Sequence, residues 1–294
     1  MATATTRRSP KLTPEMAHHQ LVAGVEALTT TEQWLAYLAV AAKFTRYSAN
    51  NTFLIMVQRP DATRVAGFHT WKSLGRSVKK GAKGIAILCP CVRRTTVEDA
   101  DSGERSTHSR LAGFRVGYVF DVTDTEGEDL PDNGLNVVHP IGVAPEGMWN
   151  ALVQRVEEAG FTVRFGPDHD EALGSAWGRT HYGDRTVTVK STADPAGACK
   201  TLAHELAHVL MHEDRLYEHR GTVEVEAESV AFVVSAAWGL DTSSYSTGYL
   251  TTWSGGDVTA VTATATKVLA CVRTILESAE SAESAESGEE VVPA

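Results

Sequence analysis

The residues most able to do chemistry form the short motif His-Glu-Leu-Ala-His at positions 204–208. On a helix, residues four apart lie on the same face, so the imidazoles of His204 and His208 can bind one metal ion. Glu205, beside the first histidine, can act as a general base toward an attacking water molecule. The flanking residues are apolar, which is typical of a helix buried on its active side. The alternative is a chance match on a surface helix with paired charges.

The third metal ligand is expected from the following helix, which offers Glu224, Glu226 and Glu228. Glu224 and Glu228 share one face of that helix, whereas Glu226 points to the opposite side and is interpreted as a solvated charge. We predict that Glu224 binds the metal and that Glu228 hydrogen-bonds a ligand histidine, with the reverse assignment still open. Two imidazoles and one carboxylate leave a coordination position open, as a catalytic zinc site requires. His212 is interpreted as a helix-end histidine.

A strongly basic segment lies inside a chain whose formal net charge is −10. Positions 43–94 contain eleven Lys or Arg and one acidic residue, a net charge of +10, which leaves −20 for the remainder. Its cations are interleaved with aromatic and amide side chains, a combination that suits single-stranded nucleic acid, because bases stack on rings while cations follow phosphates. The alternative is a solvated basic face around a small core that buries the rings. The predicted DNA-binding residues are Asn50, Asn51, Arg59, Trp71, Arg76, Lys79, Lys80 and Lys83.

The hydrophobic pattern predicts helices first and a small sheet afterwards in the N-terminal part. The expected elements are helices within 15–43, at 47–58 and at 70–75, and strands at 85–88 and 114–122 around a polar insertion at 95–110.

The C-terminal part is expected to mix helices with a short sheet around the His-Glu-Leu-Ala-His helix. The expected elements are helices at 147–159, 194–210, 223–238 and 258–276, and strands at 161–165, 175–181 and 186–190. An exposed sheet edge at 186–190 could pair with an extended peptide substrate. The fold class is therefore α+β.

Composition favours a cytoplasmic protein without a membrane partner. No uninterrupted apolar run approaches the roughly 18 residues that span a bilayer, and residues 1–10 contain no apolar core of a secretory signal. The four cysteines are too few and too scattered to make a disulfide framework.

A set of motifs in fixed order resembles the N-terminal domain of ArdC-type antirestriction proteins. The matching stretches are Tyr47-Ser48-Ala49-Asn50-Asn51, Gln58-Arg59-Pro60-Asp61-Ala62-Thr63, Gly67-Phe68, Trp71, Gly75-Arg76, Lys79-Lys80-Gly81, Lys83-Gly84-Ile85 and Val119-Phe120-Asp121. Positions 201–208 and 224–231 resemble the zincin domain of the same proteins and of ImmA/IrrE-type metallopeptidases. The resemblance implies single-stranded-DNA binding, a gluzincin-like zinc site with Glu224 as the recurring glutamate, and an antirestriction role on a plasmid or phage.

The chain is thus expected to have a disordered tail (1–15), a single-stranded-DNA-binding domain (16–140), a zinc metallopeptidase-like domain (141–276) and an acidic disordered tail (277–294). Three functions compete. The first is a DNA-tethered peptidase that cuts an unknown protein substrate. The second is a protein that shields single strands and whose zinc is mainly structural, and the third is a peptidase regulator whose basic domain binds protein. The intact Glu205 favours a catalytic site, because a structural zinc needs no general base.

Overall fold

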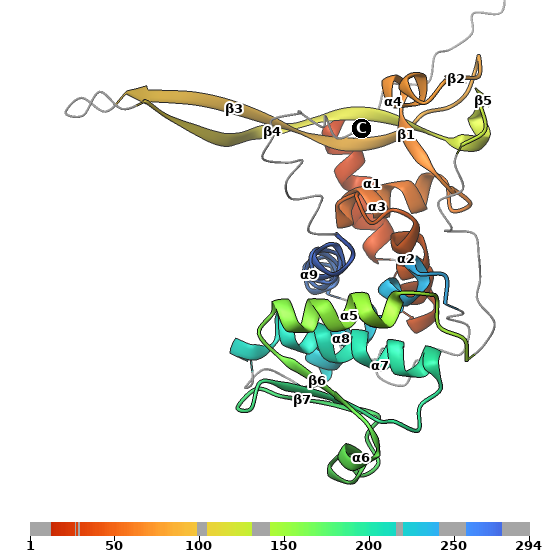
Figure 1. Ribbon diagram of the computed structural model, residues 1–294. Coiled ribbons are helices and arrows are strands. Elements are labelled where there is room, and N and C mark those ends of the chain that lie inside the picture. The colour runs from red at the N-terminus through yellow and green to blue at the C-terminus, as the bar shows by residue number, and fades with distance from the viewer. Residues whose placement is uncertain are drawn as a thin grey trace, which may run out of the picture. The chain divides into compact units, whose positions relative to one another are not determined.

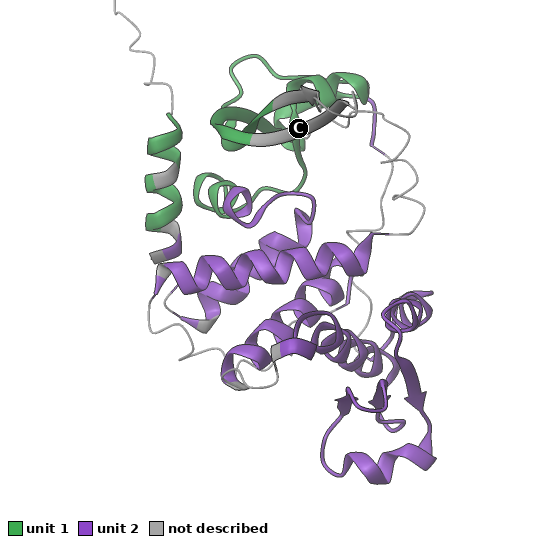
Figure 2. Ribbon diagram, turned by 90° about the vertical axis from the view of Figure 1, so that its left-hand side faces the viewer, with its two compact units in different colours: residues 1–24, 53–127, 294 green, residues 25–52, 128–293 purple. Residues whose placement is uncertain are grey.

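The computed structural model describes residues 13–26, 28, 30–98, 105–130, 142–215, 220–240 and 257–277. Helices and strands are mixed along the chain, which confirms the α+β prediction. Two compact units can be separated (Figure 2). Unit 1 takes in residues 1–24, 53–127 and 294, and unit 2 takes in 25–52 and 128–293. Of the predicted tails, only positions 13–15 and 277 are among the described residues.

The units do not follow the order of the chain, because an N-terminal helix belongs to the C-terminal fold. The helix α2 (Thr31–Lys43) packs against α8 (Arg220–Ala237). The buried indole of Trp34 donates a hydrogen bond from Nε1 to Ser229 Oγ over 3.0 Å. The helices α1 (Pro14–Glu26) and α3 (Ala49–Gln58) each cross a division between the units. The domain boundary at 140 therefore stays a prediction.

Unit 1 is built on an antiparallel sheet of β1 (Val65–Gly67), β4 (Arg105–Asp121) and β3 (Ile85–Glu98), in that order. The strands β3 and β4 form a long ribbon (Figure 1) and continue into the described residues of the polar insertion at 95–110, so both are longer than the strands predicted at 85–88 and 114–122. This stretch is rich in Thr and Arg, and β-branched residues such as Thr and Val favour a pleated strand. The helix α4 (Phe68–Ser73) and the strand pair β2 (Arg76–Val78) and β5 (Thr125–Gly127) complete the unit.

The side chain of Gln58 hydrogen-bonds the backbone of β3 on both sides of one residue. Its Nε2 donates to the carbonyl oxygen of Ala86 over 2.8 Å, while its Oε1 accepts from the Ala86 amide over 2.9 Å. The amide group thereby imitates a neighbouring strand, since it supplies one donor and one acceptor. Gln58 therefore joins α3 to the sheet.

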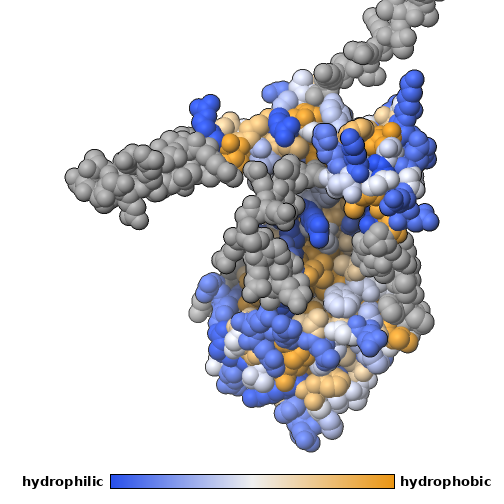
Figure 3. Space-filling view, turned by 45° about the horizontal axis from the view of Figure 1, so that its top comes forward, coloured by the Kyte–Doolittle hydropathy of each residue, from blue (hydrophilic) through white to orange (hydrophobic). Residues whose placement is uncertain are grey.

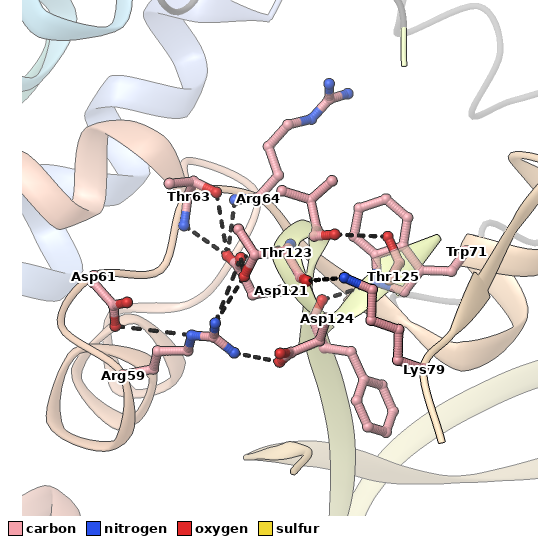
Figure 4. Close-up of polar contacts among 12 residues, drawn as sticks. Arg59, Asp61, Thr63, Arg64, Trp71, Lys79, Asp121, Thr123, Asp124 and Thr125 are labelled. Carbon is pink, nitrogen blue, oxygen red and sulfur yellow. Dashed lines mark hydrogen bonds and ion pairs between the residues drawn. The ribbon is translucent and has the colours of Figure 1, made fainter. Parts of the chain in front are cut away.

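Asp121 organises the loops around the end of β4 (Figure 4). One carboxylate oxygen accepts hydrogen bonds from the amide and hydroxyl of Thr123, over 3.0 and 2.7 Å, and the other accepts from the Thr63 amide over 2.7 Å. Arg59 lies 3.9 Å from the same carboxylate and also pairs with Asp124 and Asp61. Burial alone would raise the pKa of Asp121, but these hydrogen bonds and the Arg59 charge lower it below its usual value.

Replacing Asp121 with Asn is expected to destabilise unit 1 by about 3 kcal/mol at pH 7, because an amide turns a donor toward groups that also donate. The pKa of Asp121 is lower in the folded chain than in the unfolded chain. The carboxylate therefore stabilises the fold above pH ~4, and this stabilisation is lost as the pH falls through the pKa of the folded chain. The difference between Asn and wild type should therefore shrink in acid. Urea unfolding of both proteins, at pH 7 and at a pH below the folded-state pKa of Asp121, measures this difference in stability.

The matched control is Asp61→Asn, whose side chain is 82% exposed and pairs with the same Arg59. It should change stability by less than about 0.5 kcal/mol. Equal effects of the two substitutions at pH 7 would show that Asp121 does not organise these loops.

Unit 2 contains a three-stranded sheet in the order β6 (Thr162–Phe165), β8 (Thr186–Val189), β7 (Gly178–His181). The strand β6 runs parallel to β8, and β7 runs antiparallel to it. The expected edge strand at 186–190 is therefore the central strand, and that prediction is wrong. The strand that contacts α7 (Pro195–Met211) from the edge of this sheet is β7 (Figure 1). The helix α5 (Met148–Glu158) packs against α7 and β6, α6 (Pro167–Leu173) contacts β8, and α8 packs against α7.

The last helix, α9 (Val258–Leu276), packs against α8. By length and composition its segment Thr259–Leu276 could cross a membrane, although threonines interrupt its apolar residues. One side of this helix lies in the core of unit 2, as Val261, Ala265 and Val268 show. Core helices of globular domains commonly have this composition.

Candidate metal centre and nucleic-acid interface

The helix α7 has an apolar side, which is buried, and a second side, which presents the candidate metal ligands. It begins at Pro195, after Asp194, whose side chain accepts a hydrogen bond from the Gly197 amide over 2.9 Å. Its fully buried residues include Leu202 and Leu206. The histidines lie on another side, which faces a cavity lined by α7, α8 and β7.

Two histidines of α7 and one glutamate of α8 converge in this cavity. The Nε2 atoms of His204 and His208 lie 3.1 Å apart. Glu224 Oε2 lies 3.4 Å from His204 Nε2 and 3.8 Å from His208 Nε2. Zinc–ligand bonds of about 2.05 Å in tetrahedral geometry place neighbouring ligand atoms roughly 3.3 Å apart. The spacing and the nitrogen and oxygen donors therefore fit a divalent metal ion.

Glu228 lies behind His204, on the side away from the three converging atoms. Its Oε2 is 3.2 Å from His204 Nδ1, and its Oε1 is 3.1 Å from the ammonium of Lys200. Burial by itself would raise the pKa of Glu228, but His204 and Lys200 lower it. A carboxylate in this position orients a ligand imidazole and raises its basicity.

The pKa values of the two ligand histidines shift in opposite directions. Burial alone would lower the pKa of His204, but hydrogen bonds to Glu224 and Glu228 raise it to about 10. Burial, followed by the neighbouring His204, lowers the pKa of His208 to about 3. Burial therefore favours the neutral form of His208, the form in which imidazole binds metals.

Glu205 turns toward β7 rather than toward solvent. Thr180 Oγ1 donates a hydrogen bond to Glu205 Oε2 over 2.8 Å. Gly178 provides the room, because a Cβ atom there would lie 2.8 Å from Glu205 Oε1 and 2.6 Å from the Thr201 methyl group. Burial raises the pKa of Glu205, which moves this carboxylate toward the range useful for a base near neutral pH. Sequence reasoning missed the roles of Gly178 and Thr180, since their signal appears only when β7 is placed beside α7.

The cavity has a volume of about 790 Å³, enough for several residues of an extended peptide. Its walls add Trp177, Arg179 and Tyr182 to the residues already described. The Tyr182 hydroxyl donates a hydrogen bond to the carbonyl oxygen of His208 over 3.0 Å. Burial, together with Glu205 and two other glutamates, raises the pKa of Tyr182 to about 12, so the phenol stays protonated.

The prediction that Glu226 is a solvated charge is wrong. Its side chain is 0% exposed, and its Oε2 lies 3.1 Å from Nε2 of His212, which is itself 2% exposed. Glu226 does point away from the face shared by Glu224 and Glu228, but that side of α8 packs against other helices instead of water.

The predicted DNA-binding residues divide by their contacts. Trp71 is 2% exposed and donates from Nε1 to the Phe120 carbonyl oxygen over 2.9 Å, so its ring belongs to the core and is not available for stacking. Arg59 is occupied by the carboxylates around Asp121, and Arg76 Nε donates to Thr125 Oγ1 over 2.8 Å. The alternative interpretation of the segment thus holds for the buried Trp71, whereas Phe68, which it also expected to be buried, is 52% exposed.

The lysines of the basic segment remain on the surface. Lys79, Lys80 and Lys83 are exposed, and Lys79 Nζ also donates to the Thr123 carbonyl oxygen over 2.9 Å. Asn50 and Asn51 lie in the part of α3 that belongs to unit 2, and Asn51 is buried.

Among its described residues, unit 1 exposes three aromatic rings, of which the sequence motifs included only Phe68. Phe114 and Tyr118 of β4 are 51% and 43% exposed, and Phe68 at the start of α4 is 52% exposed. Phe114 and Tyr118, four residues apart on β4, share one sheet face, and a Cβ at Gly84, just before β3, would lie 3.0 Å from Tyr118 Cβ. Hydrophobic and hydrophilic residues are interspersed on the surface of this unit (Figure 3). The period-two spacing on β4 is the signal that could have found these rings.

Comparisons with known proteins match two successive stretches of the chain, and the first of them includes residues 25–52, which the structure assigns to unit 2. Residues 15–120 match the family described as the N-terminal domain of anti-restriction factor ArdC, and residues 156–246 match the IrrE N-terminal-like domain of a peptidase family. The uncharacterized protein pXO2-81 of Bacillus anthracis is 25% identical over 260 residues, which cover 76% of this chain. The match covers only 43% of that relative's length.

Two solved structures of the antirestriction protein ArdC from plasmid R388 are similar at low identity. The metal-free structure is 18% identical, with a TM-score of 0.48, and the alignment covers 78% of this chain and 84% of that one. The Mn(II)-bound structure is 17% identical, with a TM-score of 0.49, and the coverage is 89% and 96%. The two family matches therefore identify, in one chain, a stretch similar to the ArdC N-terminal domain followed by a stretch similar to the metallopeptidase-like IrrE domain.

Proposed function

We propose that unit 2 is a zinc metallopeptidase that acts on a protein substrate in the cytoplasm. The observation that carries this proposal is the buried Glu205 beside three converging donor atoms, because a purely structural zinc site needs no such carboxylate. His204, His208 and Glu224 would hold the ion. Two nitrogens and one oxygen favour zinc among the common divalent metals.

Different residues of the chain would perform different steps of peptide hydrolysis. When bound, zinc supplies a Lewis acid that polarises a carbonyl group and lowers the pKa of water. Glu205, held by Thr180, accepts the proton of the attacking water and delivers it to the leaving amine. The edge strand β7 lines the cavity and can align an extended peptide by backbone pairing.

Purified protein is expected to contain about one zinc per chain, and His204→Ala combined with His208→Ala should remove it, because a single remaining glutamate cannot retain the ion. Elemental analysis after dialysis measures the content. The control carries His19→Ala and His69→Ala, two exposed histidines of unit 1, and should keep its zinc. Full zinc in the first double variant would contradict the site.

For unit 1 we propose binding of single-stranded DNA in the service of antirestriction by a mobile element. Two observations support this: the match to the ArdC N-terminal domain, and exposed lysines in the same unit as exposed rings. Bases can stack on Phe68 and Tyr118 while lysines neutralise phosphates. Trp71, in the core, takes no part.

The full chain is expected to bind single-stranded DNA more tightly than duplex, with affinity that falls steeply with salt, by a slope of about −0.7 per phosphate contacted. Replacing Lys79, Lys80 and Lys83 by Ala should flatten that slope. Tyr118→Ala should weaken binding by roughly 5- to 100-fold, the value of one stacked base. Fluorescence anisotropy at several salt concentrations measures both effects.

The control is Trp177→Ala, an exposed ring of unit 2, 58% accessible, which should leave DNA affinity unchanged. Binding of neither form of DNA at low salt would favour a regulator whose basic surface contacts protein. DNA binding with zinc present but without hydrolysis would favour a protein that shields single strands.

A further inference from the structure

A buried chain of polar side chains leads from the metal centre to the far side of unit 2. His208 Nδ1 lies 2.9 Å from His212 Nδ1, and His212 Nε2 lies 3.1 Å from Glu226 Oε2. Lys267 of α9 places its ammonium 3.5 Å from the other oxygen of Glu226. The chain therefore connects α7, α8 and α9, and its two central side chains are 2% and 0% exposed.

The direction of the hydrogen bonds in this chain follows from the chemistry of its end. An ionised carboxylate only accepts hydrogen bonds, and the Lys267 charge favours the ionised form of Glu226. His212 must therefore carry its proton on Nε2 and donate it to Glu226. In neutral imidazole the other nitrogen is then an acceptor, so His212 Nδ1 offers a lone pair to His208.

This lone pair decides the tautomer of His208. Because His212 Nδ1 accepts, His208 must donate from Nδ1, and its own lone pair then lies on Nε2. Nε2 is the atom that lies 3.1 Å from His204 Nε2 and 3.8 Å from Glu224 Oε2, in the metal cavity. The opposite tautomer would point a proton at the ion.

We propose that His212 and Glu226 are positioning residues that fix the ring orientation and the metal-binding tautomer of His208. This inference rests on the proposed zinc site and deepens it. The two ligand histidines are then oriented in different ways: Glu228 contacts His204 directly, whereas Glu226 acts on His208 through an intervening imidazole. Each of these two glutamates is paired with a lysine, Glu228 with Lys200 and Glu226 with Lys267.

The substitution that isolates this role is His212→Leu, compared with His212→Gln. Leucine removes both polar atoms, whereas the glutamine amide keeps an acceptor for His208 and a donor for Glu226. Zinc affinity should fall by about 10- to 100-fold in the leucine variant. It should stay close to wild type in the glutamine variant. Competition with a chromophoric chelator measures zinc affinity, and thermal unfolding of each variant checks that it is folded.

The tautomer is read directly in wild-type protein labelled with ¹⁵N-histidine, by long-range ¹H–¹⁵N correlation spectra with and without zinc. The His208→Gln and His212→Gln variants assign the signals. His208 protonated on Nδ1 and His212 protonated on Nε2 are the expected result. A proton on Nε2 of His208, or unchanged zinc affinity in a folded His212→Leu variant, would overturn the inference.

The two proposals fail in different ways. If wild-type protein binds no zinc but His208 carries its proton on Nδ1, the positioning chain stands and the zinc proposal falls. If zinc binds tightly and the proton lies elsewhere, the zinc site stands and His212 and Glu226 have only a structural role.

Discussion

Replacing Glu205 with Gln should lower kcat/KM for peptide hydrolysis by about 100- to 10,000-fold, the usual contribution of a positioned general base. Glutamine has nearly the same shape and can still accept the hydrogen bond from Thr180, so the packing against Gly178 is kept. Zinc content should stay at the wild-type level, because Glu205 is not among the converging donor atoms. Turnover of an internally quenched, mixed-sequence peptide library with zinc present measures the loss.

The matched control is Glu157→Gln, an exposed glutamate of α5, which should leave turnover unchanged. Equal turnover of the Glu205→Gln variant and wild type would reject the mechanism. Hydrolysis that is absent from wild type as well, with zinc bound, would favour the protein that shields single strands.

The elements around the metal centre could be predicted because their signals are local. The helix that carries His204 and His208 begins with Asp194 and Pro195, and such helix starts depend on neighbouring residues only. The hairpin of β7 and β8 follows from a turn between two short β-rich runs. The order of strands could not be predicted, because β6 pairs with β8 although α6 and β7 lie between them in the sequence.

The outer contacts of the site depend on long-range packing and escaped prediction for that reason. Helical periodicity correctly separates Glu226 from Glu224 and Glu228, but periodicity does not tell whether the other face meets water or protein. In the structure α9, distant in sequence, brings Lys267 to Glu226. A glutamate whose neighbours Val225 and Ala227 are both apolar was the available signal of burial.

The basic segment shows the same limit. Composition indicated cations and rings, but only the fold separates Trp71, which is buried and hydrogen-bonded to the Phe120 carbonyl oxygen, from the exposed Phe68. Arg59 is predicted from the sequence to bind phosphate, yet two of its carboxylate partners, Asp121 and Asp124, lie more than 60 positions away. Charge patterns therefore indicate a class of partner, while the contact residues have to be read from the structure.

Among the glutamates of α8, Glu224 has the largest expected effect on metal binding. Its carboxylate oxygen lies within 3.4 and 3.8 Å of the two ligand nitrogens, so Glu224→Ala removes one of three donors and should weaken zinc binding by well over 100-fold. Glu228→Ala leaves all three donors and removes only the partner of His204 Nδ1. It should therefore weaken zinc binding by only about 10- to 100-fold. Chelator competition at fixed pH ranks the variants.

Two further variants make this ranking specific. Glu171→Ala, an exposed glutamate of α6, should not change zinc affinity. Glu224→Asp keeps the carboxylate on a shorter side chain and should recover part of the affinity, because the ion can move toward it within the cavity. A greater loss for Glu228→Ala than for Glu224→Ala would exchange their roles. The metal would then lie on the Nδ1 side of His204, beside Lys200, where a neighbouring ammonium opposes a cation.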